Sequence, residues 1–419
     1  MPQTLTQKIL QPYADNKVES PGQIVRCRIS LALANDITAT LAIKSFREMD
    51  AKRVFDKDRV VLVMDHYTPQ KDVASANQVR ECREFARETG LTHYYEGGDC
   101  GVEHALLPEL GLVGPGDLVV GADSHTCTYG GLGAFATGMG STDIAAAMAL
   151  GETWLKVPPS IHVTYSGIMP QWLRAKDLIL ALIGRIGVDG ALYSALEFDG
   201  SAIENLDVEG RMTMANMAIE AGGKAGLFAS DGNTKAWCAA HARPDAPLIA
   251  ADAGADYQAE HFFDVSAMEP LVACPHLPSN VTPVSALPDL PVNQVIIGSC
   301  TNGRISDMRD AALVLKGHKV ARDVRCIILP ATPGIWKQAM KEGLFDIFTE
   351  AGCIVGPPTC GPCLGGHMGI LGDGERAVAT TNRNFRGRMG SLESEVYLSS
   401  PVVAAASAVT GIISSPAQL

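Results

Sequence analysis

Short apolar runs that end in small and reactive residues constrain the fold of this chain more than any other feature. Four of them read RVVLVMDH (59–66), DLVVGADSH (117–125), QVIIGSCTN (294–302) and VRCIILPAT (324–332). Strands without polar alternation are buried on both faces, and helical patterns lie between these runs, so we predict an α/β fold with mainly parallel sheets. Ligands of such sheets bind beyond the carboxyl ends of the strands, where the reactive residues stand.

Two proline-rich stretches divide the chain. The length of 419 residues allows two or three domains with a large core. The segments KVPPSIHVTYSG (156–167) and PHLPSNVTPVSALPDLPVNQ (275–294) indicate a boundary and a linker. We therefore predict three α/β domains, at residues 1–159, 160–283 and 284–419.

The charge balance limits the classes of partner. A net charge of −12 argues against binding to a nucleic-acid backbone, although a local arginine cluster could still bind a small anion. No apolar run reaches the roughly 18 residues of a membrane span. The start of the chain, MPQTLTQKILQPYADNK, has no apolar signal-peptide core, so we expect a cytoplasmic protein without a membrane partner.

The stretch GPPTCGPCLGG (356–366) places Cys360 and Cys363 three positions apart. Such a pair is compatible with a redox dithiol, half of a zinc site, or two ligands of an iron–sulfur cluster. No second C-x-x-C completes a zinc site, but Cys300 follows a predicted strand and offers a third thiolate. Three thiolates would leave one iron of a [4Fe–4S] cluster open, as in a catalytic centre, yet spacing alone also allows a redox pair.

Imidazole and carboxylate side chains meet near two predicted strand ends. Asp65 and His66 end one run, Asp123 and His125 end another, and His104 lies near a predicted turn. A carboxylate beside an imidazole tunes or orients a proton carrier. A single histidine of this kind is as easily a polar core residue, but three together favour a site. The glycine stretch GGLGAFATGMGSTD (130–143) lacks the Lys-Ser/Thr ending of a phosphate loop and indicates tight backbone packing instead.

Arginines cluster near the end of the chain, in TTNRNFRGRMG (380–390). Their planar guanidinium groups bind carboxylates with two parallel hydrogen bonds, so a polycarboxylate substrate is one interpretation and a solvated basic turn is the other. Glu220 ends a predicted helix, where its charge opposes the helix dipole. It should therefore have a cation partner or a functional role.

These motifs together resemble the aconitase superfamily. The pieces MDH, GADSHT, ANMAIEAG, IIGSCTN, CGPC and NRNFRGR occur in the order of that family between residues 35 and 390. The resemblance implies three α/β domains around a central [4Fe–4S] cluster, with one iron not ligated by a cysteine. It implies that the metal ligands are Cys300, Cys360 and Cys363.

The resemblance also implies roles for the remaining residues. The proton-handling residues would be Asp65, His66, His104, Asp123, His125 and Glu220. Those at substrate or cluster would be Asn35, Ser124, Asn216, Asn382, Arg383 and Arg388. Asn35 stands where single-chain aconitases have glutamine.

The activity implied is that of a hydro-lyase that isomerises a small hydroxy-polycarboxylate by dehydration and rehydration. In the superfamily, the catalytic base lies on a fourth, swivelling domain that does not match any part of this chain. We therefore expect a small subunit as partner, in a heterodimer or heterotetramer. A thiol oxidoreductase and an RNA-binding apo-protein are the alternatives from other classes.

Overall fold

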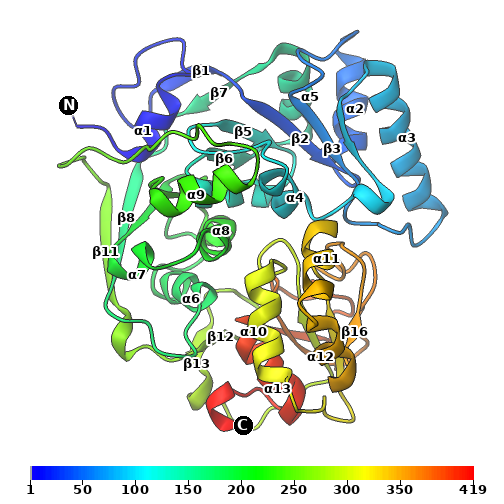
Figure 1. Ribbon diagram of the computed structural model, residues 1–419. Helices are drawn as coiled ribbons and strands as arrows, with labels where there is room; N and C mark the ends of the chain where they lie inside the picture. Colours follow the sequence, from blue (N-terminus) through cyan, green and yellow to red (C-terminus); the bar gives the residue numbers. More distant parts are fainter. Residues whose placement is uncertain (1) are drawn as a thin grey trace.

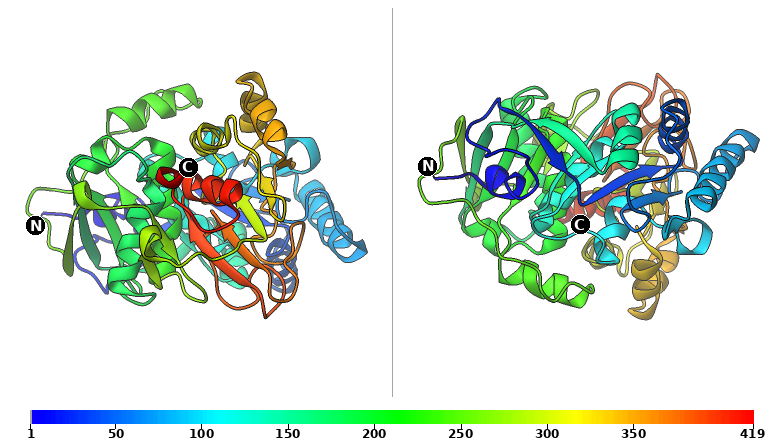
Figure 2. Two further views of the ribbon diagram at one scale, coloured as in Figure 1. Left: turned by 90° about the horizontal axis from the view of Figure 1, so that it is seen from below. Right: turned by 90° about the horizontal axis from the view of Figure 1, so that it is seen from above.

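The computed structural model describes residues 2–419, which form three helix-covered sheets and one small ribbon. Figure 1 shows the first unit in blue and cyan, the second in green, and the third in yellow to red, arranged around a common centre. The views in Figure 2 show the same three-part arrangement from below and above. Across residues 2–419, no helix combines the length and apolar character that a membrane span requires.

The first sheet has five parallel strands in the order β4-β3-β2-β5-β6. Its strands are β2 (Leu31–Asn35), β3 (Val60–Val63), β4 (His93–Tyr95), β5 (Leu118–Gly121) and β6 (Phe135–Gly138). The helices of this unit are α2 (Ala39–Glu48), α3 (Val73–Thr89), α4 (Glu103–Glu109), α5 (Ser141–Leu150) and the 3₁₀ helices η1 (Gly97–Asp99) and η2 (Ser124–Leu132). A separate antiparallel ribbon is formed by β1 (Ile24–Arg28) and β7 (Glu152–Lys156). The short helix of this part of the chain is α1 (Leu5–Leu10).

The second sheet has four parallel strands in the order β10-β9-β8-β11. They are β8 (Ser160–Ser166), β9 (Ala195–Asp199), β10 (Ala225–Phe228) and β11 (Ala259–Asp264). Its helices are α6 (Ala175–Ile186), α7 (Ser201–Glu204), α8 (Val208–Asn216), α9 (Gly232–Ala240) and the 3₁₀ helices η3 (Met217–Ala221) and η4 (Val265–Ala267).

The third sheet has seven strands in the order β13-β12-β18-β17-β14-β15-β16, and β12 pairs antiparallel with both β13 and β18 while the other pairs are parallel. The strands are β12 (Leu271–Ala273), β13 (Val281–Pro283), β14 (Gln294–Ile297), β15 (Arg325–Ile328), β16 (Ile354–Val355), β17 (Arg376–Ala379) and β18 (Glu395–Ser399). The helices are α10 (Ile305–Leu315), α11 (Pro333–Lys341), α12 (Leu344–Ala351), α13 (Pro401–Thr410) and the 3₁₀ helices η5 (Val284–Ala286) and η6 (Pro416–Gln418).

The predicted α/β fold with mainly parallel sheets is confirmed, and all four apolar runs form buried parallel strands as β3, β5, β14 and β15. The division into domains at 159 and 283 stays a prediction. Strands β12 and β13 come before residue 283 but pair within the third sheet. One hydrophobic cluster also runs from the second sheet into the third, joining Leu178 and Phe198 to Leu398.

Two glycines allow the η2 segment to pack closely against the backbone of the second unit. Gly130 and Gly131 lie against the backbone of β10 and α8, and a Cβ atom on Gly130 would stand 1.9 Å from the carbonyl oxygen of Gly226. Tight backbone packing is thus present at this glycine stretch, against β10 and α8. It brings His125, on the same 3₁₀ helix, next to the second unit.

We predict that Gly130→Ala destabilises the fold by about 1–3 kcal/mol, because the new methyl group has no room against the β10 backbone. Gly232→Ala is the matched control, since a Cβ atom there meets nothing within 4 Å. Denaturant unfolding of the two variants and the parent chain measures the difference. Equal unfolding midpoints for both variants would contradict this account of the η2 contact.

Candidate active site

Loops beyond the strands of the first and third sheets enclose a cavity of about 150 Å³. Asn35 ends β2, Asp65 and Asp123 follow β3 and β5, Cys300 follows β14, and Asn382 follows β17. Of the residues predicted for the site, thirteen line this cavity: Asn35, Asp65, His66, His104, Asp123, Ser124, His125, Cys300, Cys360, Cys363, Asn382, Arg383 and Arg388. The other two, Asn216 and Glu220, come from the second unit and contact lining residues.

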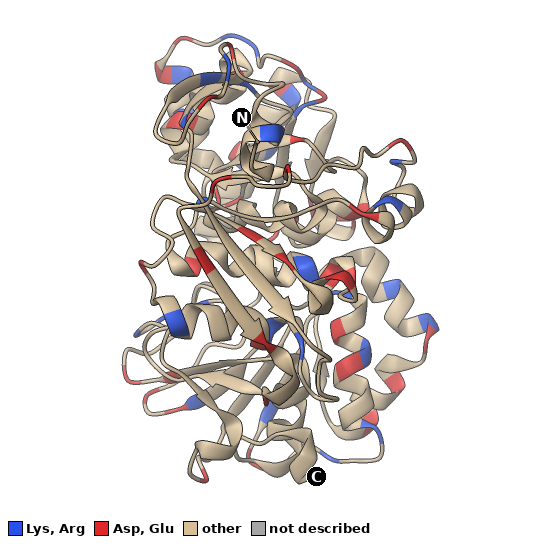
Figure 3. Cartoon of the chain, turned by 90° about the vertical axis from the view of Figure 1, so that its left-hand side faces the viewer, with Lys and Arg blue, Asp and Glu red and all other residues tan. Residues whose placement is uncertain are grey.

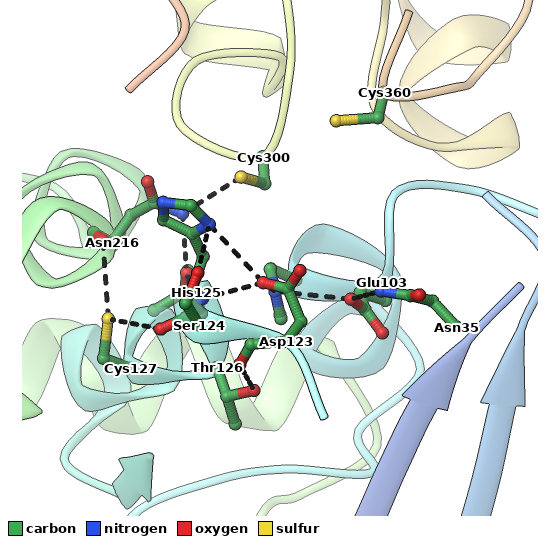
Figure 4. Close-up of polar contacts among 12 residues, drawn as sticks. Asn35, Glu103, Asp123, Ser124, His125, Thr126, Cys127, Asn216, Cys300 and Cys360 are labelled. Carbon is green, nitrogen blue, oxygen red and sulfur yellow. Dashed lines mark hydrogen bonds and ion pairs between the residues drawn. The ribbon is translucent and has the colours of Figure 1, made fainter. Parts of the chain in front are cut away.

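The three predicted metal ligands lie on two loops that face the same cavity, and each of them is at most 6% exposed. Figure 4 shows Cys300 and Cys360 on one side of this space, opposite Asp123 and Glu103. The side-chain amides of Asn216 and Asn382 both donate to the Cys300 Sγ atom at 3.2 Å. Both amide groups thus hold the Cys300 sulfur at the wall of the cavity.

Cys360 and Cys363 form a disulfide in this structure, which is the oxidised form of the redox pair that the sequence spacing left open. The tight Cys-Gly-Pro-Cys loop holds the two sulfur atoms side by side, so the pair closes when both are oxidised. A ring nitrogen of His66 and both of these sulfur atoms lie within 4.8 Å of one another. In the reduced state the loop offers two adjacent thiolates to the cavity, with Cys300 as the third.

The donor set fits an iron–sulfur cluster, because such clusters are held by cysteine thiolates. The hydroxyl oxygen of Ser299 lies 3.8 Å from the Cys300 sulfur and 4.0 Å from the Cys360 sulfur, so one small side chain spans the two loops. All three sulfur-bearing residues line the same cavity of about 150 Å³.

Three imidazoles contact carboxylates at the cavity. The His66 Nδ1 atom lies 2.7 Å from Asp65, and the Asp36 carboxylate lies 3.4 Å from the same nitrogen. Burial alone would lower the pKa of His66, but the charges and hydrogen bonds of these two carboxylates raise it well above the ordinary value. His66 is therefore a buried imidazole whose carboxylate neighbours favour its protonated form.

The second imidazole belongs to His104, whose Nε2 atom lies 2.9 Å from Asp123 while its Nδ1 atom contacts the Tyr129 hydroxyl at 3.2 Å. Here burial prevails and lowers the pKa of the imidazole. Burial would raise the pKa of Asp123, but hydrogen bonds from His104 and His125 hold it well below its usual range. The site thus places a neutral imidazole beside a fixed carboxylate.

The third imidazole belongs to His125, which lies 2.8 Å from the Glu220 carboxylate through its Nε2 atom. Burial alone would lower the pKa of His125, but Cys300, Asp123 and Glu220 raise it to about 9. Arg383 donates to both Glu220 oxygens, at 2.9 and 3.1 Å, and to the Ser124 hydroxyl at 3.0 Å. Glu220 therefore has the cation partner that its helix position required.

Arg388 differs from Arg383 because its guanidinium group is free. It makes no hydrogen bond and no ion pair within residues 2–419, and its buried Nε atom has no partner. Its one aromatic contact is with the Phe385 ring, 5.3 Å from the ring centroid. A free guanidinium at a cavity wall is suited to bind a carboxylate.

The sequence analysis missed three residues of this site. Asp36 accepts from the backbone amides of His66 and Tyr67, and Tyr129 contacts His104. Glu103 is 1% exposed, and its Oε1 atom accepts from Asn35 at 2.9 Å. Asp36 follows Asn35 and Glu103 precedes His104 in the sequence. This adjacency to predicted site residues is the signal that could have identified them. His104, predicted to lie near a turn, is the second residue of helix α4.

Comparisons with known proteins identify the family. A model of the aconitase family (aconitate hydratase) matches residues 7–289 and 284–411. The chain belongs to the aconitase family. It is 75% identical over 419 residues to the 3-isopropylmalate dehydratase large subunit of Nitratidesulfovibrio vulgaris (strain Miyazaki F), with 100% of both chains covered. It is 58% identical to the large subunit of the same name from Moorella thermoacetica, again over 100% of both chains.

The fold comparison agrees with the family match. The crystal structure of Thermococcus kodakaraensis aconitase X, in its holo-form, superposes with a TM-score of 0.51 at 14% identity, covering 90% of this chain and 89% of that one. Membership of the aconitase family implies an iron–sulfur cluster and a hydro-lyase reaction, and the cysteine-lined cavity is a candidate place for the cluster.

We predict that Glu220→Gln lowers the pKa of His125 from about 9, because the amide keeps the size of the side chain and removes its charge. The protonated His125 stabilises the fold fully at pH values below the ordinary histidine pKa. This stabilisation is lost as the pH rises through about 9. Histidine-labelled NMR titration of the cluster-free chain measures the shift, with Glu260→Gln on β11 as control. An unchanged His125 titration in Glu220→Gln would contradict the assigned cause.

Proposed function

We propose that this chain is the large subunit of a 3-isopropylmalate dehydratase, which interconverts 2-isopropylmalate and 3-isopropylmalate through isopropylmaleate in leucine biosynthesis. The observation that carries the proposal is one buried cavity lined by three cysteines, imidazole–carboxylate pairs and a free guanidinium. Curated relatives of that name, 57–75% identical over essentially the whole chain, support the same assignment.

The cofactor of the proposal is a [4Fe–4S] cluster held by Cys300, Cys360 and Cys363 in their reduced form. Three thiolates leave one iron without a cysteine ligand, in contrast to the usual four-cysteine set. When bound, the cluster supplies a Lewis acid that makes the hydroxyl of the substrate a better leaving group. The amides of Asn216 and Asn382, which donate to Cys300, support the thiolate that this requires.

Substrate carboxylates are the proposed ligands of the arginine turn. A malate carries two carboxylates, and Arg388 has an unused guanidinium at the cavity. Arg383 is held by Glu220 and presents its remaining donors beside Ser124. Asn35 and Asn382 are the further polar groups of the lining that we assign to the substrate or cluster. Cationic and amide donors of this kind also stabilise charge that builds on a carboxylate during proton abstraction.

Proton transfer to the departing hydroxide is the proposed task of the imidazole–carboxylate pairs. His66 holds its proton in a buried site and lies next to the cysteine loop, so it is our first candidate as donor. His104 and His125, oriented by Asp123 and Glu220, hold and relay protons at the opposite wall. Such positioned acids and bases typically contribute about 10²–10⁴-fold to rate.

A small subunit is the proposed partner, because we assign the base that removes the substrate C–H proton to a swivelling domain supplied by that subunit.

We predict that the cluster-loaded chain alone shows no isopropylmalate turnover and that adding the small subunit restores it. Turnover assays with isopropylmalate, homocitrate and citrate in parallel separate this function from homoaconitase, the nearest alternative. Turnover by the unaided chain would contradict the partner proposal.

Replacing Cys300 separates the cluster from the dithiol chemistry that the Cys360–Cys363 disulfide allows. We predict that Cys300→Ser loses the visible absorbance of the cluster and most of about four iron atoms per chain after anaerobic reconstitution. Cys238→Ser is the matched control, because Cys238 is equally buried but lies on α9 outside the cavity. Unchanged absorbance and iron content in Cys300→Ser would contradict Cys300 as a cluster ligand, and thiol–disulfide exchange activity retained by this variant would favour an oxidoreductase.

A further inference from the structure

The most unusual buried charge outside the site belongs to Lys176, the second residue of α6. Its side chain is 0% exposed, and no carboxylate of residues 2–419 lies within ion-pair distance. Its ammonium group donates to the main-chain carbonyl of Thr380 at 2.9 Å and to that of Thr381 at 2.5 Å. A buried cation whose only partners are neutral carbonyls is costly and needs a reason.

The two carbonyls connect Lys176 to the cysteine loop. Thr381 directly precedes Asn382, whose side-chain amide donates to the Cys300 Sγ atom. Arg383, which contacts Glu220 and Ser124, is the next residue. Lys176 therefore holds the backbone of the turn that carries Asn382 and Arg383. These two residues contact the Cys300 sulfur and Glu220 at the cavity.

Neighbouring carboxyl groups do not pair with this lysine. Both Asp177 oxygens accept from backbone amides, those of Leu271 and Arg174. The Asp307 oxygens accept from the Asn302 amide and the Arg304 backbone, and burial raises the pKa of both aspartates to about 7. Glu220 is occupied by His125 and Arg383.

The anion that acts most strongly on Lys176 is at the cavity. Burial lowers the pKa of Lys176 to about 7, and Cys300 is the largest of the groups that counteract this, ahead of Asp307, Asp177 and Glu220. Further negative charge beside Cys300 would keep the lysine protonated. Thiolates that ligate a cluster, and a substrate dianion, bring such charge.

We propose that Lys176 is a positioning residue that supplies a buried positive charge behind the turn that contacts Cys300, stabilises the thiolate-held cluster and raises its reduction potential. The proposal rests on the proposed function, since it needs a cluster on Cys300. Reduction adds one negative charge to the cluster, and a nearby cation favours that state. Net charge and hydrogen bonding around the sulfur atoms are known to set cluster potentials.

The test compares Lys176→Met with Lys176→Arg, both reconstituted anaerobically in the full-length chain. Lys176→Met should shift the reduction potential, followed by EPR-monitored titration, to more negative values. It should also speed iron loss to a chelator by about tenfold or more. Lys176→Arg retains the charge and should keep both properties near those of the parent. Lys224→Met is the control, because Lys224 is also partly buried and donates to a carbonyl but is coupled to Cys127 and Asp143.

Each outcome decides a different point. If Lys176→Met keeps the reduction potential and iron retention of the parent, the inference is overturned. It is also overturned if Lys176→Arg changes both properties as much as Lys176→Met does, because the shape of the side chain and not its charge would then be the cause. If Lys176→Met does not fold, Lys176→Gln carries the same expectation, because it keeps a neutral donor near the two carbonyls. A parent chain that binds no cluster would instead contradict the proposed function itself.

Discussion

The carboxylate of Glu220 joins the three units at one point. It lies on η3 of the second unit, contacts His125 from the first and accepts from Arg383 in the third. Because these groups are buried or half-buried, their charges interact strongly and each fixes the position of the next. The cavity is therefore held by ion pairs that cross between sheets, in addition to hydrophobic clusters that also run from one sheet into the next.

Strand topology explains why so many polar groups meet here. Parallel strands place their carboxyl ends at one edge of a sheet, and the first and third sheets turn these edges toward the same cavity. Figure 3, viewed from the left-hand side of Figure 1, shows acidic and basic residues mixed along the chain. The concentration of opposite charges at the strand ends is thus a local feature of the site.

The sequence alone could predict the parallel strands, because strands buried on both faces are apolar throughout and end in recognisable reactive residues such as Asp65, Asp123 and Cys300. It could not show that β12 and β13 pair in the third sheet, because short strands beside prolines look like a linker. Glu103 and Lys176 were missed for a related reason. Within residues 2–419, Glu103 is buried with one carboxylate oxygen unpartnered and Lys176 is buried without an ion pair, and only the three-dimensional structure shows this.

The central claim is that three thiolates hold a cluster with one iron open to the substrate. Mössbauer spectroscopy of the chain, reconstituted with ⁵⁷Fe and combined with its small subunit, tests it most directly. The account predicts that adding isopropylmalate changes the signal of one iron site in about four and leaves the others as they were. A spectrum unchanged by substrate, or one showing iron without a cluster, would contradict it.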